Sequence, residues 1–562
     1  MKTENLYYEL LIKYCDVLIS VQDKSEDPAF RGGFYCRSCK NIHGRSIDAV
    51  FGFIEAYKLT GDKKYLEAGD SAFDYGENLM CTDGGLYNDA STTWRYTTVF
   101  HLAAVIETLF AGKSILSDKI IKKYKARAEK MAKWLYENLD ENAAANINYC
   151  TTNGLSLALA GKYFGNETYL TRAARLVGYA AEHFTENGML YGECQPHDKR
   201  SKKGCYGVDI GYNTEESVPA LAKYAFLVGD EKLKEKLLSV LKSQLDFMFP
   251  DGGWDNSFGV RNNKWTYWGS RTSDGCQPAY LLFADKEPSF AEAALRNTEL
   301  LASCSENGLL YGGRDYAKHG EYPCTHHTFE HINSLAFALE NIDEKYLAPK
   351  RTGIPSDKTG GFKYFEEVDT IKASEGEYLA TLTAYDFNVP FSGHATGGTL
   401  TALYSKVKGP MIMASVTKYV LVEPTNMQQV KDIAHHRPLV PRLTCEKDGK
   451  IYSTSFYEYA TEIRDERKKS VTYTSGLSTY GNKETLENCA PKFTYTLTEN
   501  GMSISIEGAE KLRFILPLIA GKVDLQIGKI EREEEIFFLT GGFIANEMTI
   551  LPENGKIDLR IY

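Results

Sequence analysis

The sequence predicts two domains, an (α/α)6 toroid formed by a closed ring of six helical hairpins, followed by an antiparallel β-sandwich. Three observations predict this architecture. A short glycine–aromatic motif recurs through the first part of the chain, helical periodicity surrounds its copies, and alternating β-branched and aromatic runs replace both further on. With 562 residues, the chain also exceeds what one hydrophobic core usually supports.

The glycine–aromatic motif, called the signature below, lies in loops and marks one structural unit after another. A weaker copy, Ile147-Asn148-Tyr149, fills the gap between the second and third of the clear ones. The spacing leaves room for two helices and two loops per unit. The clear copies are Gly32-Gly33-Phe34-Tyr35, Gly84-Gly85-Leu86-Tyr87, Gly188-Met189-Leu190-Tyr191, Gly252-Gly253-Trp254-Asp255 and Gly308-Leu309-Leu310-Tyr311.

Apolar periodicity predicts twelve helices, hence six hairpins. Tight glycine turns at 61–62, 165–166 and 229–230 join several pairs, while the signatures occupy the other connections and lead into the even-numbered helices. This alternation predicts a closed ring with the even helices inside and the signatures at one mouth. An open superhelix would show shorter and stricter repeats. The predicted helices are 4–22, 46–60, 63–80, 95–115, 118–139, 150–164, 167–186, 215–228, 231–248, 276–284, 289–305 and 327–341.

The pattern changes after about residue 345. Runs such as Phe493-Thr494-Tyr495-Thr496-Leu497 and Met502-Ser503-Ile504-Ser505-Ile506 alternate as half-buried antiparallel strands do, and turn clusters separate them. A stretch rich in proline and glycine precedes these runs. We therefore expect the toroid at 1–345, a linker at 346–361 and the β-sandwich at 362–562.

Composition excludes several classes of protein. The formal charge of −10 argues against a nucleic-acid partner. No apolar run is long enough for a transmembrane helix, and the charged N-terminus does not resemble a signal peptide. The protein is therefore expected in the cytoplasm, or exported with a leader absent from this sequence. The 12 scattered cysteines favour reduced thiols. Cys36-x-x-Cys39 lacks a second half-site, so no metal is expected.

The predicted mouth of the toroid collects polar and aromatic residues. Inner helices present their N-termini there, and the unpaired N–H groups and the helix dipole favour an anion. The 256–271 segment is densest, because Trp265, Tyr267, Arg261 and Arg271 lie together in it. Such a loop suits an acidic sugar, and a flap packed onto the ring is the structural alternative. The other candidates are His43, Arg45, Trp94, Arg95, Asn213, Tyr311, Arg314, His326 and His327.

This layout resembles the toroid polysaccharide lyases that act on alginate, heparin and chondroitin. The Gly-rich stretch from Gly393 to Leu400, which contains His394, resembles the opening of heparinase II/III-type sheet domains. The resemblance covers nearly the whole chain in architecture, but its residue motifs are loose. It implies an enzyme that cleaves a polymer containing uronic acids by β-elimination, with an anionic polysaccharide as partner and no cofactor.

The resemblance also implies roles for individual residues. Asn213 and Arg261 would neutralise the uronate carboxylate, which makes the C5 proton acidic enough to remove. Tyr267 would transfer that proton, with nearby arginines lowering its pKa. His326 or His327 would be the second candidate, and Tyr311 an alternative base. Trp265 would stack on a sugar, and His394 would reach the mouth from the β-domain.

A glycoside hydrolase on the same toroid, similar to the unsaturated uronyl hydrolases, is the main alternative. It requires a pair of carboxylates at the mouth, and Asp48, Asp89, Glu215, Glu216 and Asp274 are available. A Glu-Glu pair at a helix start more often complements the helix dipole. A sugar epimerase and a non-catalytic sugar-binding protein are weaker alternatives. The sequence leaves open which polymer is cut, endo or exo action, and the oligomeric state.

Overall fold

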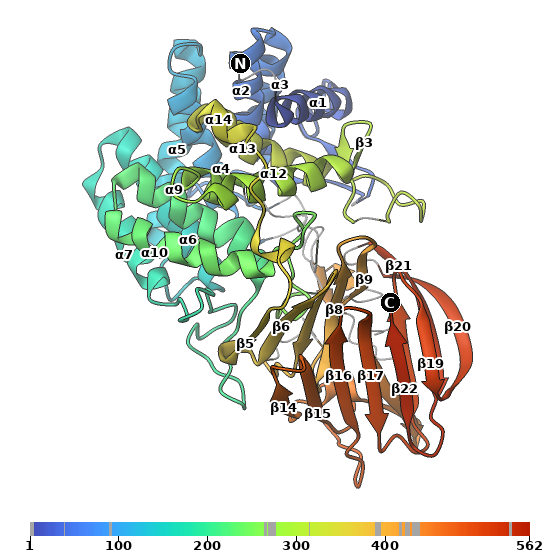
Figure 1. Ribbon diagram of the computed structural model, residues 1–562. Coiled ribbons are helices and arrows are strands. Elements are labelled where there is room, and N and C mark those ends of the chain that lie inside the picture. Colours follow the sequence, from blue (N-terminus) through green and yellow to red (C-terminus); the bar gives the residue numbers. More distant parts are fainter. Residues whose placement is uncertain are drawn as a thin grey trace.

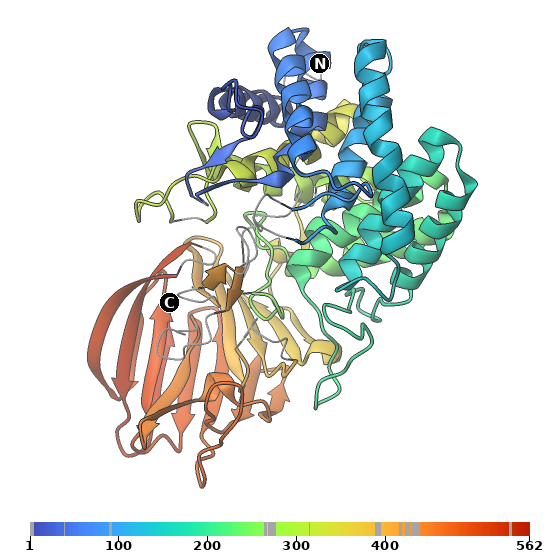
Figure 2. The same cartoon turned by 180° about the vertical axis from the view of Figure 1, so that it is seen from behind.

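A computed structural model describes the chain from residue 5 to residue 562. Its described part excludes residues 39, 89–92, 263–266, 268–276, 314, 388–394, 415–418, 422–426, 430–438 and 539–541. A helical domain precedes a domain of β-sheets along the chain, and the two stack end to end (Figure 1). The view from behind shows the same two bodies in contact (Figure 2).

Twelve helices of the described chain form two concentric rings. Each inner helix contacts the next, and the last, α13, contacts the first, α2, so the ring is closed. The predicted toroid is therefore confirmed. The inner helices are α2 (Val50–Thr60), α4 (Thr98–Ala111), α6 (Ile147–Phe164), α9 (Val218–Val228), α11 (Gln277–Leu282) and α13 (Thr325–Asn341). The outer helices are α1 (Leu6–Val21), α3 (Lys63–Tyr75), α5 (Asp118–Asn138), α7 (Glu167–Ala181), α10 (Glu231–Gln244) and α12 (Pro288–Ser303).

Short helical turns precede or follow several of these elements. The 3-10 turn η1 (Gly44–Ala49) leads into α2, and α8 (Ile210–Tyr212) with the π-helical turn η3 (Asn213–Ser217) leads into α9. A four-residue helix, α14 (Glu344–Leu347), follows α13. Among the described helices, none combines the length and the apolar character needed to cross a bilayer.

Burial separates the two rings as amphipathicity predicts. Outer helix α7 buries only Ala173, Leu176, Val177 and Ala180, whereas its partner α6 is buried nearly all round. A helix that is covered on every side carries apolar and small residues on every side, and a surface helix carries them on one stripe. Gly61, Gly165 and Gly229 end the inner helices α2, α6 and α9 in the left-handed conformation, at the predicted turns.

The five clear signatures build one repeated connection. In each, the first glycine has a positive φ, between 75° and 99°, which only glycine adopts without strain. A residue just beyond the preceding outer helix forms a β-bridge with the signature, as Met80, which follows α3, does with Leu86. The glycine also approaches the next outer helix, because a Cβ on Gly84 would lie 2.5 Å from the Lys130 carbonyl oxygen in α5. Gly308, in the last signature, lies in the same way against Val17 of α1, which closes the outer ring.

The second domain contains three antiparallel sheets. The first has the order β5-β6-β7-β8-β9, with β5 (Phe362–Phe365), β6 (Thr370–Glu375), β7 (Tyr378–Thr383), β8 (Thr399–Ser405) and β9 (Gly409–Met413). The second has the order β14-β15-β16-β17-β22-β19, with β14 (Thr461–Asp465), β15 (Ser470–Thr474), β16 (Lys492–Thr498), β17 (Gly501–Glu507), β19 (Val523–Ile527) and β22 (Ile557–Ile561).

The third sheet has the order β13-β12-β18-β21-β20, with β12 (Arg442–Lys447), β13 (Lys450–Ser453), β18 (Arg513–Leu518), β20 (Lys529–Phe538) and β21 (Phe543–Leu551). Short two-stranded pairs are β1 (Tyr35–Cys36) with β2 (Asn41–Ile42), β3 (Ser305–Glu306) with β4 (Leu309–Leu310), and β10 (Tyr419–Leu421) with β11 (Met427–Gln429). Strand β16 contacts β6 and β7, and β18 contacts β9, so the sheets enclose one apolar core as a sandwich does.

The outer face of the first sheet packs against the mouth of the toroid. Strands β7 and β8 are buried along their whole length because toroid loops cover one face and the second sheet the other. Aromatic pairs cross the contact, with ring centroids 4.8 Å apart for both Phe247–Phe365 and Phe249–Tyr404. Lys372 also forms an ion pair with Asp255 across it. The expectation that the β-domain abuts the mouth is met for the described residues.

Candidate active site

The start of α6 and the loop between α7 and α8 form one corner of the mouth. The Ile147 N–H donates to the Gly192 carbonyl (3.0 Å), and the Gly192 and Glu193 N–H groups both donate to the Gly207 carbonyl. Tyr191 and Val208 form a β-bridge beside them. This backbone ladder places Asn146 and Asn148 next to the two arms of the loop. The loop hangs from the helical domain toward β5 in both ribbon views (Figures 1 and 2).

Arg261 projects its guanidinium into this corner. Its Nη2 donates to Asn146 Oδ1 (2.8 Å), and its Nε donates to Glu193 Oε2 (3.2 Å). The Asp209 carboxylate accepts its backbone N–H (2.9 Å) and so fixes the turn that carries it. Burial acts to lower the pKa of Arg261, but Glu193, Tyr212 and Asp209 hold it above its ordinary value. The side chain keeps 12% of its surface exposed, so a permanent cation faces the mouth.

The carboxyl of Glu193 is completely buried behind Arg261. Burial raises its pKa to about 8, against the pull of Arg261, and the neighbouring carboxyls Asp209 and Glu216 add to the rise. At neutral pH this group therefore holds a proton for much of the time. Arg261 then keeps positive charge that a fully ionised partner would cancel, and this charge is available to an anionic ligand.

Asn148 supplies an amide two residues into α6. Its Nδ2 donates to Glu216 Oε2 (2.7 Å), while its Oδ1 is buried without a hydrogen-bond partner among the described residues. A buried, unpaired amide oxygen costs free energy unless water or a ligand satisfies it. Because the unpaired atom is an acceptor, it suits a hydroxyl group of a substrate, while the remaining Nδ2 hydrogen can donate to a carboxylate.

Two half-buried tyrosines flank the same corner. The rings of Tyr191 and Tyr206 pack in a tilted pair with centroids 4.0 Å apart, and their hydroxyls are hydrogen-bonded. Burial, and then Tyr206, raises the pKa of Tyr191, which therefore remains a neutral phenol. Arg200 places its guanidinium carbon 3.1 Å from the Tyr206 ring centre. A phenol next to a cation and a neutral donor suits proton transfer.

Aromatic side chains continue the surface from the other side of α6. Trp94 donates its indole N–H to the Tyr149 hydroxyl (3.1 Å), and Tyr96 packs against both rings. All three are half-buried and can stack on a sugar face. Arg95 Nη1 donates to both carboxylate oxygens of Asp83. The guanidinium carbon lies over the Trp134 ring, 4.8 Å from its centre. Trp94 and Arg95 thus lie near the mouth, as expected.

Two of the predicted catalytic residues have other roles in the structure. The buried Tyr267 hydroxyl donates to Asp251, and burial and then Asp251 raise its pKa well above the ordinary value. The arginines expected to lower that pKa do not determine it. Asn213 is fully buried, and its side-chain amide is hydrogen-bonded to backbone groups. Its Nδ2 donates to the Leu190 and Asp209 carbonyls, and its Oδ1 accepts from the Leu190 N–H. These settings speak against the predicted roles of Tyr267 and Asn213.

His43, Arg45 and His326 meet in a buried cluster in the inner wall. Arg45 pairs with Asp48 (3.0 Å) and Glu330 (2.7 Å), and His326 stacks on His43 with ring centroids 4.3 Å apart. Burial, then His43 and Arg45, lowers the pKa of His326 well below its ordinary value. Because each is at most 5% exposed, this arrangement speaks against the direct sugar contact predicted for them.

Of the remaining predicted residues, His327 and Tyr311 belong to the described part of the chain, and the others do not. His327 is buried in α13, where its backbone N–H donates to Cys324 Sγ. Its backbone carbonyl accepts a hydrogen bond from the His331 ring nitrogen Nδ1. Tyr311 donates its hydroxyl to Glu306 (2.7 Å), and burial and then Glu306 raise its pKa to about 12. Neither setting favours a catalytic role. The predictions for Trp265, Arg271, Arg314 and His394 lie outside the described residues, as do Asp89 and Asp274.

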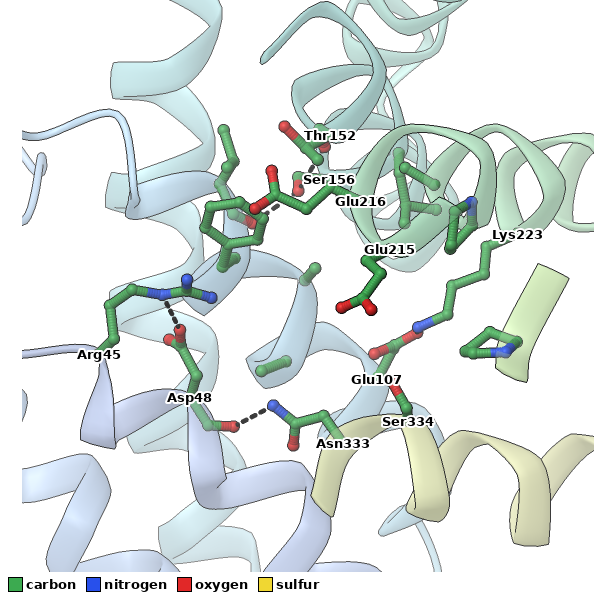
Figure 3. A pocket seen from close by; sticks show the side chains of 18 residues that line it. Arg45, Asp48, Glu107, Thr152, Ser156, Glu215, Glu216, Lys223, Asn333 and Ser334 are labelled. Carbon is green, nitrogen blue, oxygen red and sulfur yellow. Dashed lines mark hydrogen bonds and ion pairs between the residues drawn. The ribbon is translucent and has the colours of Figure 1, made fainter. Parts of the chain in front are cut away.

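A cavity in the bore of the toroid gathers the carboxylates of the hydrolase alternative. Asp48, Glu215 and Glu216 line it, and Figure 3 shows Glu215 pointing into the space near the ion pair between Glu107 and Lys223 (3.1 Å). Its volume is about 60 Å³, enough for a few water molecules. Sites for small organic ligands measure roughly 300–1,000 Å³. The cavity is therefore too small in this structure to hold a sugar ring.

Sequence reasoning missed several residues of the corner. The sequence offered no reason to group Arg261 with Glu193, Tyr206 or Glu216. It did mark Tyr191 as a signature residue, and Asn148 and Tyr149 as part of the weak copy. The signal that could have found this corner is that these signature copies lead into inner helices. Within the described residues, no group of three or more His, Cys, Asp or Glu side chains is arranged to hold a metal ion.

Comparisons with known proteins identify the family and support the fold. Residues 11–357 match the ulvan lyase N-terminal domain, and residues 362–536 match the ulvan lyase C-terminal domain. A broad-specificity ulvan lyase from Formosa agariphila is 35% identical over 536 residues, covering 92% of this chain and 83% of that protein. The crystal structure of a Streptomyces coelicolor chondroitin AC lyase, in complex with chondroitin sulphate, superposes with a TM-score of 0.54 at 11% identity, covering 99% of this chain and 79% of that one.

The toroid, the appended sheets and these matches define a polysaccharide lyase, an enzyme that cleaves a uronic-acid-containing polysaccharide by β-elimination. Within that class, the chain belongs to the ulvan lyase family. The family match decides against the hydrolase, epimerase and sugar-binding alternatives. The resemblance to toroid polysaccharide lyases is thereby confirmed.

Proposed function

We propose that the protein cleaves ulvan, with the reaction centred on the corner formed by α6, Arg261 and the Tyr206 loop. The substrate follows from the matched relative, whose name gives ulvan in place of the alginate or glycosaminoglycan expected from the wider resemblance. One observation supports the location: the backbone ladder from Ile147 through Gly192 to Gly207 brings the segments that carry Asn148, the Arg261 contact and Tyr206 to one corner of the mouth. An amide, a cation and a phenol are the kinds of group that elimination beside a carboxylate requires.

In this proposal, Arg261 and Asn148 bind the uronate carboxylate. The C5 proton becomes acidic only when negative charge can flow onto that carboxylate, and preorganised donors stabilise the resulting dianion. Arg261 contributes positive charge, since Glu193 behind it is largely protonated at neutral pH. Asn148 contributes an amide that Glu216 orients.

Tyr206 is the proposed proton carrier. As a phenolate it takes the proton from C5, the C–H electrons form the C4–C5 double bond, and the C4–O bond breaks. The phenol then returns its proton to the leaving oxygen, which restores the phenolate. Tyr191 supports this cycle because it remains a neutral donor whose hydroxyl is bonded to Tyr206. Trp94 and Tyr149 offer stacking surfaces for neighbouring sugars.

The test follows the ultraviolet absorbance of the unsaturated uronate product during incubation with ulvan, alginate, heparin and chondroitin. Ulvan is expected to give the highest kcat/KM. A preference for another of these polymers would overturn the substrate proposal and leave the class intact. Tyr206→Phe tests the assignment of the site, with Tyr191→Phe as the matched control that keeps the paired rings. We expect the first variant to lose nearly all activity and the second to lose only part.

A further inference from the structure

We propose that Lys203 is a positioning residue, which fastens the loop that carries Tyr206 to the β-domain and so makes catalysis depend on that domain. This inference rests on the proposed function, since it requires Tyr206 to act in the reaction. Lys203 itself lies at the tip of the loop and touches no substrate in this arrangement.

The Lys203 ammonium has all three of its protons bound by the β-domain. It pairs with Asp369 and donates to the carbonyls of Ala384 and Ala460, each at 3.0 Å. A lysine ammonium has three donors, so its capacity is fully used. The Lys203 N–H donates to Asp386 Oδ2 (2.9 Å) as well. One side chain thereby joins the loop to three separate segments of the sheets.

The acceptors are themselves fixed. Asp369 lies between β5 and β6 and is 5% exposed, and its carboxylate accepts from the Tyr364 hydroxyl (3.1 Å) while its carbonyl accepts from the Ala384 N–H (3.1 Å). Exposed ion pairs contribute little because water competes and long side chains lose freedom. This contact is half-buried, with the Lys203 side chain 24% exposed and the Asp369 side chain 6% exposed, and it includes hydrogen bonds to backbone carbonyls, so it constrains the position of the loop.

The backbone transmits this constraint to Tyr206. A tight turn connects the two residues, with the Ser201 N–H donating to the Cys205 carbonyl (2.9 Å) and a β-bridge between Arg200 and Tyr206. The β-domain also holds Tyr206 directly. Its N–H donates to the Glu367 carbonyl (3.0 Å), and its own carbonyl accepts from the Tyr385 hydroxyl. The second domain therefore holds the backbone of Tyr206, while the Tyr206 ring contacts Tyr191 and Arg200 of its own loop.

Charge balance around Lys203 agrees with a fixed contact. Glu462 is hydrogen-bonded to Asp369, and burial, then Asp369, raises the pKa of Glu462 to about 7. At neutral pH Glu462 therefore holds a proton for part of the time. Asp386 accepts a hydrogen bond from the Lys203 backbone N–H. The Arg464 guanidinium carbon lies over the Tyr364 ring, 3.5 Å from its centre.

Lys202 provides a matched control on the same loop. It also reaches the β-domain, pairing with Glu458 (2.9 Å) and Tyr459, but its side chain is 58% exposed. Lys203→Met and Lys202→Met each remove one charge at adjacent positions of the full-length enzyme. Misplacing a reacting group by about 1 Å can cost roughly 100-fold in rate. We therefore expect Lys203→Met to lower kcat about 10–100-fold with KM nearly unchanged, and Lys202→Met to stay within about twofold.

Hydrogen exchange of residues 195–208 gives a readout that does not depend on activity. In Lys203→Met, amide protection in this loop should fall, and in Lys202→Met it should match the parent. Lys203→Arg should recover part of kcat, because it restores the charge and most donors. Should Lys203→Met fail to fold, Asp369→Asn provides the same test with a neutral acceptor.

Unchanged kcat and unchanged loop exchange in Lys203→Met, beside an inactive Tyr206→Phe, would overturn the inference and leave the proposed function standing. An active Tyr206→Phe would overturn both. A loss of kcat in Lys203→Met without any change in loop exchange would also reject Lys203 as a positioning residue.

Discussion

Replacement of Arg261 by alanine tests the proposed site most directly. The change removes the bonds to Glu193 Oε2 (3.2 Å), Asn146 Oδ1 (2.8 Å) and the Glu193 carbonyl (3.3 Å). Breaking a buried ion pair costs about 3–5 kcal/mol when it leaves an uncompensated charge. Glu193 already has a pKa of about 8, so it can remain protonated at neutral pH. We therefore expect a smaller loss of stability, about 2–3 kcal/mol, from the hydrogen bonds alone.

The effect on activity should be larger than the effect on stability. Loss of one preorganised donor to a developing oxyanion costs about 2.7–4 kcal/mol, or about 10²–10³-fold in rate. Because Arg261 is proposed to touch the carboxylate in both ground and transition states, KM should rise and kcat should fall. Initial rates from product absorbance give both constants, and thermal unfolding gives the stability.

Glu193→Gln provides the matched control for Arg261→Ala. Because Glu193 is already largely protonated at neutral pH, the double variant Glu193→Gln with Arg261→Ala should be about as stable as Arg261→Ala. It should not recover activity. If Arg261→Ala keeps kcat/KM within about threefold of the parent, the guanidinium does not neutralise the substrate carboxylate. If the double variant regains activity, the defect came from the unpaired Glu193 carboxyl, and the proposed role of Arg261 is wrong.

Three further predictions follow from the same contacts. Tyr206→Phe should lower kcat about 10²–10⁴-fold with little change in KM, as measured by product absorbance. Tyr267→Phe should lower the unfolding temperature and keep kcat, since it loses only the bond to Asp251, about 1–2 kcal/mol. Glu462 has a folded-state pKa of about 7, above its ordinary 4.5, so the stability it contributes is complete below pH 4.5 and is lost as pH rises through 7. Glu462→Gln should flatten this part of the profile of unfolding temperature against pH.

Each of these predictions has an outcome that contradicts it. A Tyr267→Phe variant that folds normally and loses elimination would restore Tyr267 as the proton carrier and remove Tyr206 from that role. An unfolding temperature that rises between pH 5 and 8, or that changes in the same way in Glu462→Gln, would show that the carboxyl pair with Asp369 does not govern this pH range.

The sequence predicted the architecture because the signals for it are local. The first glycine of each signature takes a positive φ, and that preference belongs to the residue itself. Helical periodicity likewise depends on neighbours three and four positions away, so all twelve helices of the ring could be located before any tertiary contact was known. Ring closure then follows from the alternation of short turns and signatures.

The identity of the site residues depends on contacts between distant segments, and here the sequence was a poor guide. Arg261 pairs with Glu193 and Asn146, whereas Tyr267, six residues later, donates to Asp251 and packs against Phe543. Residue type and position in a loop do not determine which way a side chain points.

Tertiary structure therefore made three decisions that the sequence alone could not. It brought Arg261 to Asn146, 115 positions away, and it placed Tyr206 on Glu367 and Tyr385 of the second domain. It also buried His43 and His326 against each other in the wall of the ring. The physical reason is the same in each case. The pKa, exposure and direction of a polar side chain are set by the groups packed around it, and in this protein most of those groups come from another hairpin of the ring or from the β-domain.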